Sequence, residues 1–464
     1  MRFLTRAGTV LTLLVPACLP ATEVPLGRSS AVQAAPPPRE PAPPPKTGRL
    51  VVAVVVDQLP SWALERYRQL LDATGALRRA MEGGAYFSHA RYDYAGTYTA
   101  PGHATLFTGA LPRVHGVLAN EVWDAGRGKV VSVVDDGEHA VIGTNDQFAS
   151  PLVLRAPTVA DVLERETHGR AVTVAISLKD RAAVLPAGQH PDAVSFYDTK
   201  RGSFTSSTWY AGGIPKFLAD FQTAHPISAA LVVWEPVHPE ALLALLGPDA
   251  QSGEGDWLGL GNAFPHDVRR SPEPLSALRV TPFATEYLFD VARAAVRGLA
   301  LGADEAPDLL MLSVSPTDYA GHVFGPESWE YVDSLVRLDR ALTRFLNELP
   351  PGTRVLLSSD HGAAPLPERS LDRGHLALRV RTKKLAAAVN AALAGHFGLK
   401  EPPVASYTEP FVYFSKEAQS SPSFGAVLDA VAGEFEKAPG VAAVYSVRAL
   451  LARAPENELE RLVR

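Results

Sequence analysis

Acidic residues and histidines follow three apolar segments of the sequence at the point where each segment ends. The residues concerned are Asp57 after 50–56, Asp318 and His322 after 309–314, and Asp360 and His361 after 354–358. Carboxylates and imidazoles, in a chain with one cysteine, suit a borderline metal such as Zn²⁺. These groups exceed the ligands that one tetrahedral ion needs, so they predict a site for two metal ions.

Each of these features has an ordinary structural explanation when it is taken alone. An Asp after a strand is often the N-cap of the next helix, which would account for Asp57. An Asp-x-x-x-His pair is common by chance. Asp360-His361 is more specific, because Gly362 lets the chain turn away after two adjacent ligands. The combination therefore predicts the metal centre, and no single pair does.

A threonine lies just before an expected helix start between the first two expected strands. Thr99 heads the stretch TAPGHATLFTG. The free N–H groups and the dipole at a helix N-terminus favour an anion, including a phosphate or a developing alkoxide. A hydroxyl held there beside a metal can act as a nucleophile. Taken alone, the stretch favours Thr99 as a simple N-cap. Together with the predicted Asp and His ligands, it favours Thr99 as a nucleophile.

The segments that must position these residues alternate between strand and helix patterns. Strands are expected at 50–56, 171–176, 309–314 and 354–358, and helices at 60–73, 158–165, 283–301 and 328–349. The β-branched run at 50–56 is typical of a strand covered on both faces. The alternation predicts an α/β fold, a doubly wound, mainly parallel sheet with helices on both faces. Ligand sites of such sheets lie at the carboxyl ends of the strands.

Two other segments have different patterns. Residues from about 188 to 282 are rich in Gly, Pro, Trp and polar residues, and we expect them to form a cap inserted in a catalytic domain of 49–375. Residues 376–464 predict a small α+β insertion, after which the main sheet is incomplete. Its expected elements are helix 385–397, strand 411–414, helix 424–437 and strand 441–445.

The N-terminal residues are typical of an exported protein. Arg2 and Arg6 precede a short apolar run at 8–17, and the lone cysteine, Cys18, ends it. This resembles a bacterial lipoprotein signal over residues 1–18, followed by a Pro-rich linker over 19–48. The alternatives are an ordinary signal peptide with an incidental cysteine, or a cytosolic protein. We expect an exported protein, in the periplasm or anchored to the outer membrane through a lipid on Cys18.

Composition excludes several classes of protein. The chain has 464 residues, 46% of them hydrophobic and 20% charged, so it can bury a large core. Its formal net charge of −6 argues against general binding to nucleic acid. No apolar run approaches the roughly 20 residues that a membrane-spanning helix needs. A single cysteine excludes an intramolecular disulfide.

Taken in order, the motifs resemble the alkaline phosphatase superfamily. The resemblance covers about residues 49–450 and rests on Asp57, the Thr99-Ala-Pro-Gly-His103 stretch, Asp318-x-x-x-His322 and Ser359-Asp360-His361-Gly362. The sequence is similar in particular to the bacterial phosphate-irrepressible type with a Thr nucleophile. It is also similar to the neighbouring nucleotide pyrophosphatase/phosphodiesterases. The resemblance implies one zinc held by Asp57, Thr99, Asp360 and His361, and a second by Asp318 and His322. It also implies a phosphothreonine at Thr99, which water on the second zinc hydrolyses.

Three further residues bear on the substrate. Asn120 matches the family's Asn that hydrogen-bonds a phosphoryl oxygen, and Lys179 and Arg181 match the Lys and Arg that contact phosphoryl oxygens in the phosphate-irrepressible type. A monoester dianion offers three free oxygens to two cations and an amide, whereas a diester has less charge and a second ester group. The alternative is an exposed Lys–Arg loop pair.

The predicted function is therefore hydrolysis of small-molecule phosphate monoesters. The alternatives are a phosphodiesterase or nucleotide pyrophosphatase of the same superfamily, and a non-catalytic lipoprotein that binds metal or phosphate. The last alternative is supported by a missing metal ligand. In the family, a late Thr-His-Gly stretch supplies a second zinc-binding His, and this sequence has no such late stretch. After His361 only His375 and His396 remain. We expect a partial sequence; otherwise His375 substitutes, or one zinc site is degraded.

Overall fold

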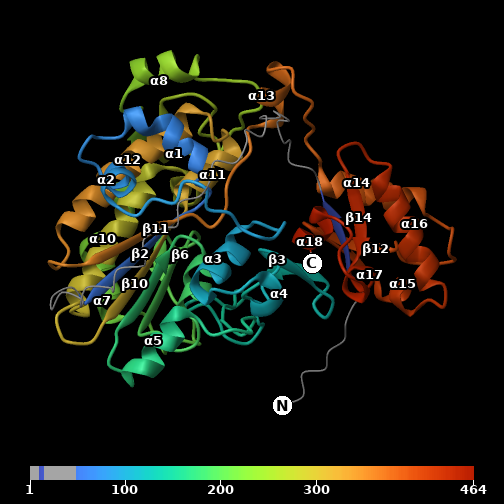
Figure 1. Ribbon diagram of the computed structural model, residues 1–464, viewed down its shortest axis with the longest axis horizontal. Coiled ribbons are helices and arrows are strands. Elements are labelled where there is room, and N and C mark those ends of the chain that lie inside the picture. The colour runs from blue at the N-terminus through green and yellow to red at the C-terminus, as the bar shows by residue number, and fades with distance from the viewer. Residues whose placement is uncertain (1–9, 15–48, 464) are drawn as a thin grey trace, which may run out of the picture.

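A six-stranded sheet forms the centre of the larger body of the protein. Figure 1 shows the computed structural model, which describes residues 10–14 and 49–463. The strand order is β11-β2-β10-β5-β6-β7, and β7 alone is antiparallel to its neighbour. The bounds are β2 (Leu50–Val56), β5 (Thr173–Ser177), β6 (Ala193–Asp198), β7 (Ser203–Thr205), β10 (Asp308–Val314) and β11 (Arg354–Ser358). The α/β fold with a mainly parallel sheet is thus confirmed.

Side chains of β2 alternate between two hydrophobic cores. Val52 and Val54 belong to the core that includes α1 (Ser61–Tyr67), α2 (Ala76–Gly83), α10 (Pro282–Gly298) and α12 (Trp329–Asn347). Ala53 and Val55 belong to the core that includes α3 (Thr99–Thr108), α5 (Val159–Thr167) and α6 (Asp180–Ala187). Because strand side chains alternate between faces, helices cover both faces of the sheet, as a doubly wound fold requires.

The longer helices of the larger body agree with the expected ones to within a few residues, with one exception. The expected helix 60–73 ends at Tyr67 and continues only as a 3₁₀ turn to Leu70. The start of α5 follows from its sequence, because Thr158 and Asp161 form a reciprocal capping box. The other helices of the larger body are α4 (Pro112–His115), α7 (Lys216–Ala224), α8 (Pro239–Leu246), α9 (Pro274–Ala277), α11 (Pro316–Val323) and α13 (Pro367–Asp372).

The segment 188–282, expected as a cap, is divided by the structure. Strands β6 and β7 belong to the central sheet, so only the residues after Thr205 lie outside it. They include the short hairpin of β8 (Val233–Trp234) and β9 (His266–Asp267). The sequence of β6, AVSFYD, contains buried Ser195 and Asp198. These polar residues interrupt the apolar run that identifies the other parallel strands.

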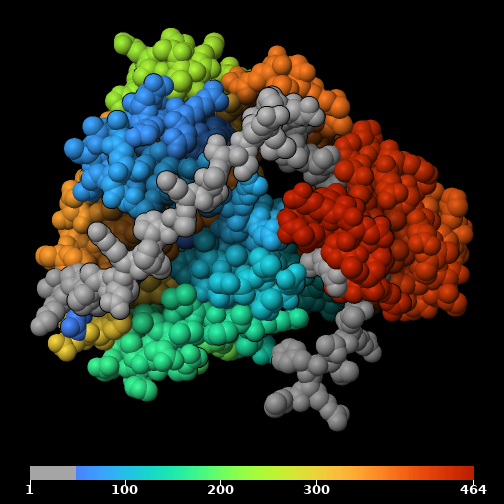
Figure 2. Space-filling model, viewed as in Figure 1, coloured from blue at the N-terminus to red at the C-terminus, as the bar shows by residue number. Residues whose placement is uncertain are grey.

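Residues beyond the larger body form an α+β unit with its own core. Its sheet has the order β12-β13-β1-β14. Figure 2 shows the unit as a separate mass beside the segment that carries α3 and α4. Its elements are α14 (Thr382–Ala392), β12 (Val404–Thr408), β13 (Phe411–Phe414), α15 (Lys416–Ser420), α16 (Phe424–Glu436), β14 (Ala443–Ser446), α17 (Val447–Ala452) and α18 (Glu458–Val463).

Strand β1 (Val10–Leu14) comes from the apolar run predicted to belong to a signal peptide. It pairs antiparallel with β13 on one side and β14 on the other. The rest of the predicted signal, including Cys18, and the predicted linker 19–48 lie outside the described residues. In the part of the chain that is described, no helix combines the length and apolarity needed to cross a bilayer.

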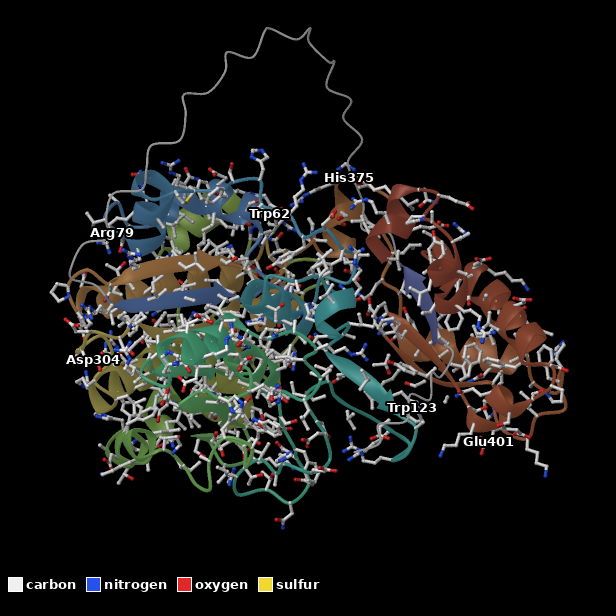
Figure 3. All side chains as sticks on the ribbon, turned by 60° about the horizontal axis from the view of Figure 1, so that its bottom comes forward. Trp62, Arg79, Trp123, Asp304, His375 and Glu401 are labelled. Atoms are coloured by element: carbon white, nitrogen blue, oxygen red, sulfur yellow. The ribbon has the colours of Figure 1, made fainter. Side chains whose placement is uncertain are left out.

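The α+β unit contacts the loop that leads into α3. The backbone N–H of Ala95 donates to the carbonyl of Leu462 at 2.9 Å, and Arg461 pairs with Asp93 at 2.7 Å. The hairpin of β3 (Glu121–Asp124) and β4 (Lys129–Ser132) also reaches this unit, since β3 contacts β12. Figure 3 shows Trp123 of β3 at this boundary. The unit therefore supports the segment that positions Thr99.

Candidate active site

The structure brings most of the predicted site residues together at the carboxyl end of the sheet. Asp57 follows β2, Asp318 lies in the first turn of α11 after β10, and Asp360 and His361 follow β11. Lys179 follows β5. Neighbouring parallel strands end at the same edge, so short local segments place all five residues side by side. Helix α1 begins four residues after Asp57, at Ser61, so Asp57 is not its N-cap.

One group of three ligands fits a metal ion. Oxygen or nitrogen atoms of Asp57, Asp360 and His361 lie within 4.8 Å of one another, and all three side chains are buried. Within the described residues, Asp57 Oδ1 and Asp360 Oδ2 accept no hydrogen bond, although ring nitrogens of His361 and His103, respectively, lie 3.3 Å from them. Leaving buried carboxylate oxygens unpartnered is costly, and a cation removes that cost. Two carboxylates and an imidazole are a donor set that zinc accepts.

The second predicted pair is adjacent to this group but less complete. His322 Nε2 lies 3.1 Å from Asp318 Oδ1, and Asp318 Oδ1 lies 3.8 Å from His361 Nε2. The His322 side chain is 68% exposed. His375 is exposed near the connection to the α+β unit (Figure 3), and His396 is exposed in that unit. Over residues 49–463, neither histidine joins a three-ligand group.

Lys179 is the central cation of the site. Its Nζ lies 2.6 Å from Asp57 Oδ2, 2.5 Å from Asp318 Oδ2 and 3.3 Å from Thr99 Oγ1. Burial alone would lower the pKa of Lys179, but the two carboxylates outweigh it and raise the pKa above its ordinary value. The lysine is only 4% exposed, so the alternative of an exposed loop pair is wrong for this residue.

Thr99 is the first residue of α3 and is almost fully buried. Tyr98, and not Thr99, occupies the N-cap position, so the N-cap alternative is wrong. The hydroxyl is therefore available to react beside the free N–H groups of the first helical turn. Asn120 Oδ1 accepts the N–H of Ala100 at 2.8 Å. That bond fixes the Asn120 carboxamide beside Thr99 and leaves its NH₂ group to donate to a ligand oxygen.

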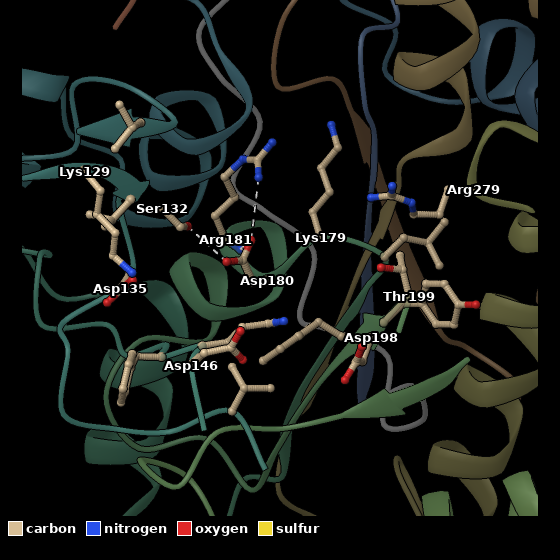
Figure 4. A pocket seen from close by; sticks show the side chains of 18 of the residues that line it. Lys129, Ser132, Asp135, Asp146, Lys179, Asp180, Arg181, Asp198, Thr199 and Arg279 are labelled. Carbon is tan, nitrogen blue, oxygen red and sulfur yellow. Dashed lines mark hydrogen bonds and ion pairs between the residues drawn. The ribbon is translucent and has the colours of Figure 1, made fainter. Parts of the chain in front are cut away.

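Arg181 lies in the first turn of α6, close to Lys179. Its guanidinium is 3.6 Å from Asp180, its side chain is 22% exposed, and its buried Nε has no hydrogen-bond partner among the residues that the structure describes. With Lys179 it lines a cavity of about 370 Å³ (Figure 4). In the view of Figure 4 both side chains project to the same side. Lys179 and the Asn120 amide thus lie beside the buried Thr99 hydroxyl, and Arg181 lines the cavity together with Lys179.

Gln58 and His103 also belong to the site, although no role is predicted for either from the sequence. The Gln58 backbone N–H donates to Asp360 Oδ1 and its Nε2 donates to Asp318 Oδ1, both at 3.1 Å. Gln58 has a positive φ of 59°, which no sequence pattern reveals. His103 contacts the Thr99 carbonyl at 2.8 Å and Asp360 Oδ2 at 3.3 Å. Its place one helical turn after Thr99 is the signal that could have identified it.

Opposite charges control the protonation of the ligand group. Burial favours the protonated form of Asp360, but the charges of His361, of the nearby His103 ring and of Lys179 hold the pKa of Asp360 well below its ordinary value. Burial alone would lower the pKa of His361, but Asp360 and Asp57 raise it to about 10. His361 must release that proton to bind a metal, so metal binding at this site is coupled to proton release.

The fold and the site define a member of the alkaline phosphatase superfamily, with ligands for metal and a buried hydroxyl at the carboxyl ends of parallel strands. A family model described as type I phosphodiesterase / nucleotide pyrophosphatase matches residues 51–402. The chain belongs to that family. The predicted superfamily is therefore confirmed.

Among curated proteins, the chain is similar to the alkaline phosphatase PafA of Elizabethkingia meningoseptica. The two are 33% identical over 423 residues, which cover 86% of this chain and 75% of PafA. The alkaline phosphatase PhoV of Synechococcus elongatus is 32% identical over 347 residues, 72% of this chain and 63% of PhoV. The chain thus spans less than two thirds of PhoV.

Solved structures agree with these matches. A crystal structure of wild-type PafA superposes with a TM-score of 0.81 at 31% identity, covering 91% of this chain and 83% of PafA. A PafA variant substituted at a threonine, an asparagine, a lysine and an arginine gives a TM-score of 0.82.

Proposed function

We propose that this protein hydrolyses phosphate monoesters through a covalent intermediate on Thr99. The observation that carries the proposal is the position of the Thr99 hydroxyl. It is buried at the start of α3, and its oxygen lies 3.3 Å from the ammonium nitrogen of Lys179. The similar proteins PafA and PhoV are both named alkaline phosphatases, which supports the same reaction class.

The chemistry follows from the residues of the chain. The Thr99 oxygen attacks phosphorus, the P–O bond to the leaving alcohol breaks, and the alcohol departs with a proton. Lys179, Arg181 and Asn120 hold the non-bridging oxygens, where negative charge is concentrated. Water then cleaves the phosphothreonine, releasing phosphate and restoring the Thr99 hydroxyl. Each step keeps the phosphoryl group within reach of the same cations.

We further propose that the metal is zinc and that the complete site takes two ions. Asp57, Thr99, Asp360 and His361 would hold one, and Asp318 and His322 would contribute to the other. Zinc at these ligands would favour the ionised form of a bound hydroxyl and offset phosphoryl charge. Elemental analysis of an active preparation should find two zinc ions per chain; one ion would contradict the two-metal proposal.

Thr99→Ala tests the reaction. The variant should lose several powers of ten in turnover of an aryl phosphate at alkaline pH, because no preplaced alkoxide remains. Thr99→Ser should retain part of the activity. Thr108→Ala is the matched control, since Thr108 ends the same helix and its hydroxyl bonds only to local backbone. A Thr99→Ala variant that keeps more than about a tenth of wild-type turnover would exclude the nucleophile role.

A phosphodiesterase is the second candidate, because the matching family is described by that activity. The ratio of kcat/KM on an aryl monoester to that on the matched aryl diester separates the two candidates. A ratio well above one supports the monoesterase. A ratio below one would favour the diesterase, and it would show that Lys179 and Arg181 do not serve a dianion.

We propose that the protein is exported and anchored through a lipid on Cys18. The support is the position of the lone cysteine at the end of the apolar run 8–17. A diacylglyceryl group supplies two chains, as stable anchoring requires. Cleavage before Cys18 would also remove β1, so the α+β unit must be stable without that strand. Cys18→Ser should move the protein from the membrane to the soluble fraction; unchanged fractionation would favour ordinary secretion.

A further inference from the structure

A cavity lies beside Lys179 and Arg181 of the candidate active site. It has a volume of about 370 Å³, which is within the usual range for small-molecule sites. Lys179, Arg181 and Arg279 all line it. In the view of Figure 4 these three cations lie along one side of the cavity, and Asp146 and Asp198 lie along the other. Arg279 is not required by the reaction proposed above.

Arg279 is held in a defined position. It lies in the 3₁₀ segment Leu278–Val280. One guanidinium nitrogen donates to the Tyr319 hydroxyl at 3.2 Å, and Nε donates to the Ser276 carbonyl at 3.3 Å. Its guanidinium carbon lies 5.0 Å from the centre of the Tyr319 ring, and Lys179 Nζ lies 5.1 Å from the same ring. A ring that contacts both cations fixes Arg279 relative to the phosphoryl-binding lysine.

The charge of Arg279 is uncompensated, whereas the acids of the cavity wall are paired. Among residues 49–463, Arg279 has hydrogen-bond and ring contacts but no ion-pair partner. By contrast, Asp135, Asp146 and Asp198 pair with Arg127, Lys200 and Arg201, which do not line the cavity. The fourth acid of the wall, Asp180, lies 3.6 Å from Arg181, which does line it. A preorganised guanidinium with free N–H groups beside a cavity suits a carboxylate or a phosphate.

We propose that this cavity receives the leaving group of the phosphate ester, and that Arg279 selects leaving groups that carry a second anionic group, a carboxylate or another phosphate. The proposal rests on the proposed function, because a phosphoryl group held by Lys179 and Arg181 directs the rest of the ester along the same row of cations. Arg279 then contacts the part of the substrate that departs, and it is a specificity residue.

Binding and turnover are measured with two matched pairs of probes on the metal-loaded full chain. 4-Carboxyphenylphosphonate and its uncharged isostere 4-carbamoylphenylphosphonate report binding by calorimetry, and the corresponding aryl phosphates report kcat/KM. Arg279→Gln should weaken binding of the carboxylate probe on the order of 10-fold to 100-fold, the range for a lost charge-assisted hydrogen bond. The carbamoyl probe should change by less than about 3-fold, and Arg279→Lys should restore part of the preference.

Arg270→Gln is the control, since the Arg270 side chain is 86% exposed and, within the described part of the chain, forms an ion pair with Asp267 alone. Tyr319→Phe removes the hydroxyl that positions Arg279, and it should reduce the preference if Arg279→Gln does not fold. Equal weakening of both probes, or no change in either, would overturn the proposal. Wild-type protein that prefers the carboxylate phosphonate but hydrolyses neither ester would refute the proposed function alone. Hydrolysis of both esters with no effect of Arg279→Gln would refute the specificity role alone.

Discussion

Gly102→Ala should disable the site by forcing apart two segments of backbone. Gly102 lies in α3, three residues after Thr99, where the helix crosses the end of β11. A Cβ atom at this position would lie 2.1 Å from the carbonyl oxygen of Asp360 and 2.7 Å from its carbonyl carbon. Both contacts are with backbone atoms, so no change of rotamer can relieve them.

The size of the effect follows from this geometry. Ordinary contacts of a Cβ begin near 3.4 Å, so α3 and the segment of Asp360 must separate by about 1 Å. Overpacking of this kind costs about 1–3 kcal/mol of folding free energy. A displacement of about 1 Å between Thr99 and the ligand group should lower the rate by on the order of 10²-fold.

The assay compares kcat/KM on an aryl monoester, the melting temperature and the metal content of Gly102→Ala with those of the wild type. Gly433→Ala is the matched control, because Gly433 lies inside α16 and a Cβ there meets nothing within 4 Å. The control should keep full activity and gain up to about 1 kcal/mol of stability from helix propensity. Wild-type activity and melting temperature in Gly102→Ala would refute the close approach of α3 to Asp360.

Two further predictions concern charge. The double variant Lys179→Ala/Arg181→Ala should lose about 10²–10⁴-fold in kcat/KM on an aryl monoester and much less on the matched diester; equal losses would contradict a role in monoester preference. Burial raises the pKa of Glu254 to about 8. Its folded form therefore keeps a proton that the unfolded chain releases, and stability falls as pH rises from about 4.5 to 8. In urea unfolding between these pH values, Glu254→Gln should lose about 1–3 kcal/mol less unfolding free energy than the wild type. If the unfolding free energies of the two proteins change equally with pH, the raised pKa of Glu254 is contradicted.

Local patterns were sufficient for the sheet and for much of the site. The run LVVAVVV is buried on both faces in β2, and Asp57 follows it directly. Asp360 and His361 follow β11 after one intervening residue, Ser359, although β11 is an edge strand that is largely exposed. A side chain that immediately follows a parallel strand must lie at the carboxyl edge of the sheet, whatever the rest of the fold does. The positions of these candidate ligands were therefore predictable from the sequence.

Other features depended on contacts between distant segments. The sequence of β6 has no uninterrupted apolar run, and only its pairing with β5 places it in the central sheet. Gln58 reaches Asp318 and Asp360 through a positive φ. Arg279 lines the same cavity as Lys179, 100 residues away in the chain. A short pattern determines the type of an element and the residues at its ends, whereas the approach of two elements depends on how all the side chains between them pack.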